Sequence, residues 1–283
     1  MALTSSDIIG HPEVLLLIQR QSGALISAFH LNPRISSVFA TQQRWLLAHA
    51  AMALAFRQGG ATSPRLTLSR FLDEVERYGI ASRNTADAFI KEMMHYHYAM
   101  AIENPDDRRE KPLIVSPAPL DMLHRWLSTH LTTLDAIDHG LRLESLKTVP
   151  MAFAAIEIEV ASSFMTAIGM REPEGAVSLF TWFNNGGIVM DWLITCITGQ
   201  STDQQTYITS ITSISEIADW IHISRTHLTR KLREAETMGS MGWSGKRGGS
   251  PMWVSAGFVD EVISYQAAKL AIIDAACERA FNR

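Results

Sequence analysis

Apolar residues recur three and four positions apart over much of the chain, which is the spacing of one face of an α-helix. In the segment 12–29 the apolar positions near one face are Val14, Leu17, Ile18, Leu25 and Phe29. A second apolar segment, 38–56, is followed by Gly59 and Gly60, which favour a helix end at that point. The pattern predicts two packing helices in the N-terminal part of the chain.

Residues 66–94 show a short helical pattern, a turn and a second helical pattern. Gly79 favours the turn, because glycine readily adopts the left-handed backbone conformation that ends helices. Ser82 is a typical N-cap residue for the helix that follows. This segment therefore predicts a helix-turn-helix.

Residues 213–236 have the same plan. Ser213 and Glu216 have the spacing of a capping box, and the short helix that they begin is expected to run to about Trp220. Ser224 then caps the next helix. A second helix-turn-helix is predicted here.

One offset relates the two segments, since Ser82 and Ser224 are 224 − 82 = 142 positions apart. The same offset aligns the inward stripe of each second helix: Ala86, Ile90 and Met93 with Leu228, Leu232 and Ala235. Farther along, residues 111–123 match residues 250–262 at an offset of 254 − 115 = 139. A unit of roughly 140 residues therefore occurs twice, and the predicted domains are 1–142 and 143–283.

Each unit reads as packing helices, a helix-turn-helix, two short strands around a loop and a closing helix. The predicted fold class is mainly α with small β-wings, formed by two winged helix-turn-helix units that are framed by packing helices.

Composition is that of a globular protein, with 47% apolar and 19% charged residues. The first 20 residues lack the pattern of a signal peptide, and the apolar run "VLLLI" at 14–18 is far too short to span a bilayer. Cys196 and Cys277 lie in apolar helical segments without metal-ligand spacing. We therefore expect a cytoplasmic protein with reduced cysteines and no contact with a membrane.

The first wing, "NPDDRREKPLIVSPAP" at 104–119, resembles that of the multiple antibiotic resistance regulator (MarR) family of bacterial transcription factors. That family's wing has an Asp-x-Arg element, a strand and then a Thr or Ser before the last helix. Here Asp107, Arg109, the strand around 113–115 and Ser116 occupy those places. The resemblance covers residues 35–138 and implies a DNA-binding transcriptional regulator.

The second wing, "GSMGWSGKRGGSP", keeps the topology but has no Asp-x-Arg element. Lys246 and Arg247 lie at its glycine-rich tip, where we expect them to have no acidic partner nearby. Members of the family are usually homodimers with one winged helix per chain, so this chain resembles two fused subunits. The resemblance implies a single-chain pseudo-dimer that binds an operator in double-stranded DNA as a monomer, with further self-association left open.

A recognition helix contacts the major groove through its N-terminal, outward residues. The DNA contacts predicted for the first unit are Arg83, Asn84, Asp87 and Lys91 on the helix, with Arg108, Arg109 and Lys111 on the wing. Those predicted for the second unit are Arg225, Thr226, Thr229, Arg230 and Arg233 on the helix, with Lys246 and Arg247 on the wing.

Charge placement supports this interpretation of the second unit. Residues 143–283 contain 11 Lys and Arg against 15 Asp and Glu, yet six of the 11 lie between 225 and 247. Positive charge is thus concentrated where phosphates would be met. The alternative is an ordinary solvated helix face in a ligand-sensor or interaction scaffold that has lost DNA binding, which the net charge of −4 favours.

Other chemistry has weaker support in the sequence. His95 and His97 have a spacing that a metal could use on a strand, but no further ligand completes a site, and a helix-to-strand corner is the alternative. No enzyme motif is present, and neither a cofactor nor a metal is expected. The family resemblance also implies a small aromatic ligand, with Trp45, His49 and Tyr96 as the predicted pocket residues.

Overall fold

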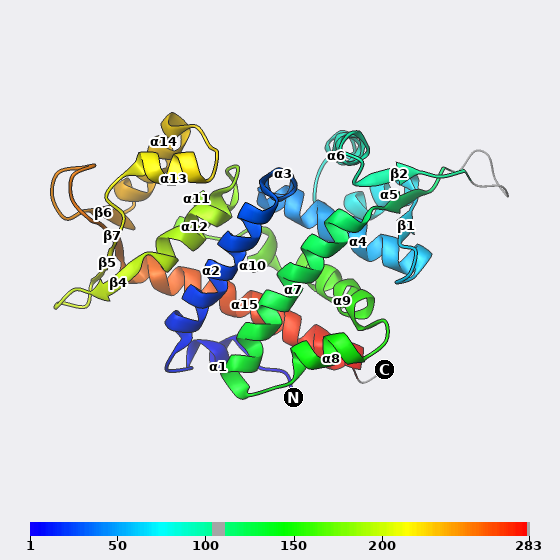
Figure 1. Ribbon diagram of the computed structural model, residues 1–283, viewed down its shortest axis with the longest axis horizontal. Helices are drawn as coiled ribbons and strands as arrows, with labels where there is room; N and C mark the ends of the chain where they lie inside the picture. Colours follow the sequence, from blue (N-terminus) through cyan, green and yellow to red (C-terminus); the bar gives the residue numbers. More distant parts are fainter. Residues whose placement is uncertain (104–110, 282–283) are drawn as a thin grey trace. The chain divides into compact units, whose positions relative to one another are not determined.

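The computed structural model describes residues 1–103 and 111–281, and it is mainly helical with two small antiparallel sheets (Figure 1). Mainly α with small β-elements is therefore confirmed as the fold class. The chain forms two compact units. Unit 1 comprises Met1–Thr4, Gln42–Arg171 and Lys269–Arg283, and unit 2 comprises Ser5–Thr41 and Glu172–Ala268. These units cut across the predicted division at 142 and 143.

Unit 1 is a helical body with a three-stranded sheet. Its elements in chain order are α4 (Gln42–Gly59), β1 (Arg65–Leu66), α5 (Leu68–Tyr78), α6 (Arg83–His95), β2 (Ala99–Ala101), β3 (Leu113–Val115), α7 (Pro117–Asp138), α8 (Arg142–Thr148), α9 (Ala152–Thr166) and α10 (Ile168–Arg171). The C-terminal part of α15 (Ala256–Phe281) also belongs to this unit. Helices α4 and α9 pack along one another, and the rings of Phe56 and Phe153 meet edge to face at 5.4 Å.

Helices α5 and α6 of unit 1 have the predicted turn and cap between them. Gly79 ends α5 in the left-handed conformation, with φ 61° and ψ 33°. The hydroxyl oxygen of Ser82 accepts a hydrogen bond from the Thr85 amide at 3.2 Å, so it caps α6 as expected. The predicted inward stripe of Ala86, Ile90 and Met93 is buried.

The sheet of unit 1 has the strand order β1-β3-β2, with both pairings antiparallel. Arg65 pairs with Ile114 on one side of β3, and Ala99 pairs with Val115 on the other. The sequence analysis predicted β2 and β3 but not the short strand β1.

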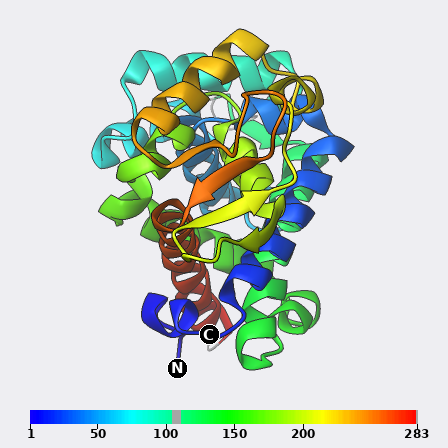
Figure 2. The ribbon, with the colours of Figure 1, turned by 90° about the vertical axis from the view of Figure 1, so that its left-hand side faces the viewer.

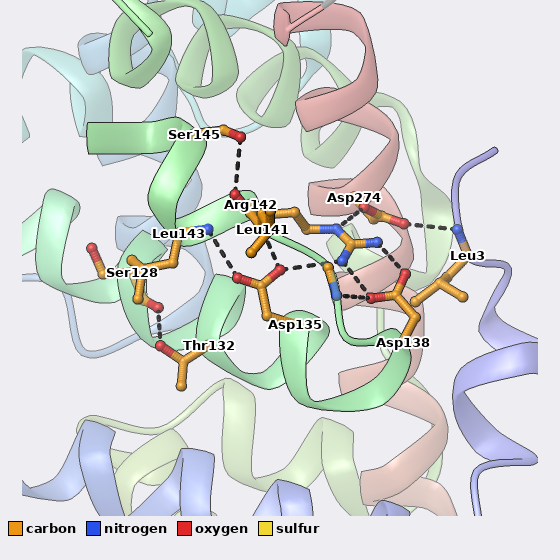
Figure 3. A network of polar contacts seen from close by, with 11 residues as sticks. Leu3, Ser128, Thr132, Asp135, Asp138, Leu141, Arg142, Leu143, Ser145 and Asp274 are labelled. Carbon is orange, nitrogen blue, oxygen red and sulfur yellow. Dashed lines mark hydrogen bonds and ion pairs between the residues drawn. The ribbon is translucent and has the colours of Figure 1, made fainter. Parts of the chain in front are cut away.

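An ionic cluster fixes the corner between α7 and α8 in unit 1. Figure 3 shows the Arg142 guanidinium between the carboxylates of Asp135, Asp138 and Asp274. The Leu3 amide donates to the same Asp274 at 2.7 Å. Hydrogen bonding to Arg142 is the main cause that holds the pKa of Asp138 below its usual range. The chain at the predicted domain boundary between residues 142 and 143 is thus held by several ion pairs.

Unit 2 combines helices with a four-stranded sheet. Its elements are α1 (Ser5–Ile9), α2 (Val14–Leu31), α3 (Pro33–Val38), α11 (Gly175–Thr181), α12 (Gly186–Thr195), β4 (Ile197–Gln200), β5 (Thr206–Thr209), α13 (Ile214–Trp220), α14 (Arg225–Thr237), β6 (Met241–Trp243), β7 (Met252–Ser255) and the N-terminal part of α15.

Helix α2 packs along α12, and buried polar side chains connect it to its neighbours. Ser22 donates to Asp191 at 2.7 Å, and Gln21 donates to Gln266 at 3.1 Å. Within the described residues, α2 is the one helix whose length and apolar composition would let it cross a membrane. Its buried polar contacts fit a core helix, because both groups find their partners inside unit 2.

The sheet of unit 2 has the strand order β4-β5-β7-β6, and all of its pairings are antiparallel (Figure 2). β6 and β7 are the two strands that the sequence predicted around the second wing. The hairpin of β4 and β5 was not predicted.

The second helix-turn-helix differs from the prediction in one cap. Ser213 occupies the N-cap position of α13, but its side chain makes no capping hydrogen bond, so the predicted capping box with Glu216 is wrong. The helix still begins there, and burial of Ile214 and Ile217 stabilises its first turn. Ser224 does cap α14, since its hydroxyl accepts from the His227 amide at 3.5 Å.

Candidate functional site

The exposed face of α14 collects the five predicted DNA contacts of this helix. The opposite face of the helix is fixed by Leu228, Leu232 and Ala235, each 0% exposed, so the outward orientation of the remaining positions is determined. One open depression is lined by Arg225, Thr226, Thr229, Arg230 and Arg233. The structure therefore brings these five residues together.

The arginines of this face are not neutralised within the described part of the chain. Neither Arg225 nor Arg233 has a carboxylate within 4.0 Å there, and Arg230 contacts only the imidazole of His227, at 3.4 Å. Lys231, at the flank of the helix, pairs with Glu234 at 2.8 Å. Three guanidinium groups on one exposed face, without an acidic partner, create a positive potential that suits a polyanion.

The second wing is anchored to α14 through Glu236. One carboxylate oxygen of Glu236 accepts from the Trp243 indole nitrogen at 3.1 Å, and the other pairs with Arg247. The expectation that Arg247 has no acidic partner nearby is wrong, because Glu236 approaches from eleven positions earlier in the chain. Lys246 is exposed at the wing tip. The wing is thus positioned relative to α14 by these two contacts.

Gly242 on β6 contributes to the form of this wing. A side-chain carbon added there would lie 2.4 Å from the Trp253 ring, which covers the glycine. Only glycine allows the ring of β7 to pack so closely on β6. This contact supports an ordered strand pair at the base of the wing.

On α6 the corresponding positive charges are paired. Arg83 lies 3.2 Å from Asp73 and 3.4 Å from Glu76, both on α5. Lys91 pairs with Asp87 one turn earlier, at 2.6 Å. Asn84 is exposed between them. This face carries the predicted residues, but its charge is balanced by carboxylates of the same helix pair.

The first wing falls largely in the undescribed segment. Arg108 and Arg109, together with Asp107, lie outside the described residues. Lys111 is described and exposed, two positions before β3. The predicted contact made by the Asp-x-Arg element therefore stays a prediction.

Two of the three predicted pocket residues, Trp45 and His49, lie together in unit 1. The Trp45 and His49 rings lie 4.4 Å apart, and both also contact the rings of Trp126 and Phe164. Tyr96 is exposed just after α6, where its ring neighbours are His95 and Tyr98. Trp45 and His49 thus belong to a ring cluster, whereas Tyr96 packs on other residues.

Buried ionisable groups accompany this cluster, and two of them, Glu157 and His130, were not predicted from the sequence. His49 bonds to Glu157 at 2.8 Å, and burial raises the pKa of that carboxyl group. His130 is fully buried, which lowers its pKa to about 3. Glu157 could have been noticed as one of two acids in the apolar run of α9, whereas its partner is 108 positions away.

His95 ends α6, and His97 lies in the turn before β2 with φ 58°. The helix-to-strand corner is therefore what the structure shows at this position. In the described ranges there is no group of three or more His, Cys, Asp and Glu side chains placed to hold a metal ion.

Comparison of the chain with protein-family models, with curated proteins and with solved structures gives no match.

Proposed function

We propose that the protein is a DNA-binding transcriptional regulator in which two winged helix-turn-helix elements lie on one chain. The observation that carries the proposal is the face of α14, where Arg225, Arg230 and Arg233 are exposed together without a carboxylate partner among the described residues. Phosphates supply the missing counter-charge, and Thr226 and Thr229 add hydroxyl groups for phosphate or base contacts.

The order and pairing of the elements support a duplication. In unit 1, α5 and α6 precede β2 and β3, and α7 follows; in unit 2, α13 and α14 precede β6 and β7, and α15 follows. The central strand also has matching neighbours, since β3 lies between β1 and β2 as β7 lies between β5 and β6. A helix-turn-helix followed by a two-stranded wing is the arrangement that the resemblance to the MarR family implies.

The composition of the compact units supports a pseudo-dimer. Unit 2 includes α2 from the first half of the sequence, and unit 1 includes α9 from the second half. Each helix packs on a helix of the other half, α2 on α12 and α9 on α4. Such an exchange of packing helices is expected of two fused subunits. We propose that one chain in the cytoplasm suffices to bind an operator.

A small aromatic ligand remains a prediction of the family resemblance. Trp45 and His49 are near one another, but their rings already contact Trp126 and Phe164. A ligand at this place would therefore take the position of one of these rings.

The proposal is tested by titrating the full chain with a random-sequence duplex DNA at several salt concentrations. We expect a steep fall of affinity with salt. Arg225→Ala/Arg233→Ala should weaken binding and reduce the slope of log affinity against log salt by about one unit per lost phosphate contact. The control Arg20→Ala/Arg125→Ala removes the same charge from exposed positions on α2 and α7 and should leave the slope unchanged.

The second candidate is a ligand-sensor or interaction scaffold without DNA binding. It is favoured by the paired charges of α6 and by the net charge of −4. In the same titration this candidate predicts no salt-dependent binding of the wild type.

A further inference from the structure

We propose that the two halves contact DNA unequally: α14 and its wing hold one half of the target, whereas α6 is restrained by carboxylates of its own helix pair. The inference rests on the proposed function and adds that the DNA target is read asymmetrically. Its basis is a position-by-position difference between the outward faces of the two helices.

The outward positions of α6 and α14 correspond at the offset of 142. On α6 these positions are Arg83, Asn84, Asp87, Ala88 and Lys91, and on α14 they are Arg225, Thr226, Thr229, Arg230 and Arg233. The first set carries two positive charges and one negative, 2 − 1 = +1, whereas the second carries three positive charges and no negative one. A phosphate backbone would therefore meet a much stronger positive potential at α14.

Helix α5 increases the difference. Asp73 and Glu76 both lie within ion-pair distance of the Arg83 guanidinium. At the same offset their positions in the second half are Ser215 and Ala218, which are uncharged. Arg83 is thus engaged by two carboxylates, and the matching arginine, Arg225, meets neither.

Asp87 has the same effect one turn farther along α6. It pairs with Lys91 at 2.6 Å, and the matching position on α14 is Thr229. Both cations on the outward face of α6 are therefore neutralised from within the helix pair. The carboxylates that form these ion pairs have no counterpart at the matching positions of the second half.

These ion pairs weaken DNA binding by α6 mainly through the negative charge of the carboxylates, and less by holding the side chains in place. Arg83, Asp73 and Glu76 are all more than half exposed, and exposed pairs of this kind contribute only about 0–1 kcal/mol. The pairs can therefore open, but three carboxylates remain close to any phosphate that approaches, and like charges repel. Removing the carboxylates should therefore strengthen the contact of α6 with DNA.

Three variants of the full chain test this directly. The release variant is Asp73→Asn/Glu76→Gln. The two charge-removal variants are Arg83→Ala/Lys91→Ala on α6 and Arg225→Ala/Arg233→Ala on α14. The matched control for release is Glu13→Gln/Glu144→Gln, which removes the same charge at exposed positions away from α5 and α6. The probe is a 30-bp duplex of random sequence, measured across salt, and circular dichroism confirms that each variant is folded.

We expect the α14 charge-removal variant to bind DNA about tenfold or more weakly than the wild type. The α6 charge-removal variant should change the affinity less than about twofold. The release variant should raise affinity relative to its control and steepen the salt slope by about one unit.

Similar losses of affinity in both charge-removal variants, or a release variant that matches its control, would overturn the asymmetry while leaving DNA binding in place. A wild type without salt-dependent binding would overturn the proposed function and the inference with it. The two failures are therefore distinguishable.

Discussion

Helices α6 and α14 have similar buried faces and different exposed faces. The inner stripes, Ala86, Ile90 and Met93 in one and Leu228, Leu232 and Ala235 in the other, are all buried. Outside, α6 places its cations beside carboxylates, and α14 leaves three arginines without such partners in the described chain. Packing thus preserves the helix pair in each unit, while the solvent-facing positions are free to take different functions.

Among the substitutions considered, Arg142→Ala in unit 1 should show the largest effect. Asp274 is 1% exposed, so Arg142→Ala would leave a buried carboxylate without its main counter-charge. We expect a loss of about 3–5 kcal/mol in the free energy of unfolding. Arg279→Ala, which removes the more exposed pair with Glu159, should cost about 0–1 kcal/mol. Chemical denaturation measures both, and equal losses would contradict the structural role of the cluster.

The shared inner stripe predicts similar costs for matched truncations. Ile90→Ala in α6 and Leu232→Ala in α14 each remove a buried branched side chain, and each should lower stability by about 2–5 kcal/mol. Hydrogen exchange should localise the loss to the helix pair that carries the substitution. A negligible effect in one of them would show that the two helix pairs are not equivalent in packing.

Acid should destabilise unit 1 through His130. The folded chain keeps this imidazole neutral down to a pKa of about 3, whereas the unfolded chain takes up a proton near pH 6.5. Stability is therefore complete above pH 6.5 and declines as the pH falls toward 3, by on the order of 2 kcal/mol at pH 5.

His130→Gln keeps a donor for the Trp126 carbonyl and removes the titrating group, so it should flatten the pH dependence between 5 and 6.5. Among the described residues of unit 2 no histidine is buried, so hydrogen exchange should register the acid effect in unit 1. A pH dependence unchanged by His130→Gln would assign the effect to other groups.

The helix caps give the smallest expected effect. Ser82→Ala and Ser224→Ala should each cost about 0.5–2 kcal/mol, since each removes a side-chain acceptor for an amide at a helix start. The loss should be larger for Ser82, whose bond to the Thr85 amide is 3.2 Å against 3.5 Å for Ser224. Ser213→Ala, in contrast, should be nearly neutral because its side chain makes no capping bond. Thermal unfolding of the three variants decides the order.

The sequence predicted features that depend on near neighbours. Gly79 and Ser82 mark a helix end and a helix start through local backbone chemistry, and the stripe from Ala86 to Met93 follows from helical spacing. The hairpin of β4 and β5 was missed because β4 is largely exposed and neither strand alternates clearly between apolar and polar positions.

Contacts between distant residues also escaped the sequence analysis. The bond between His49 and Glu157 joins residues 108 positions apart, and the pair of Arg247 with Glu236 depends on how the wing folds back on α14. Arg83 was identified as a DNA contact from its place on the helix. Its engagement by Asp73 and Glu76 required the angle between α5 and α6, which spacing alone does not give.

The most direct test of the central claim is photocrosslinking from matched positions on the two helices. Thr226→Cys and Asn84→Cys place one thiol on the exposed face of α14 and α6, respectively. Burial raises the pKa of the Cys196 thiol and raises that of Cys277 to about 12, so a thiol-directed photoprobe should label the introduced cysteine in preference. Labelling of the wild type gives the background. With a random-sequence duplex, we predict strong crosslinking from the Thr226→Cys variant and little from the Asn84→Cys variant. Crosslinking confined to the Asn84→Cys variant, or none from the Thr226→Cys variant, would contradict the assignment of α14 as the DNA-contacting helix.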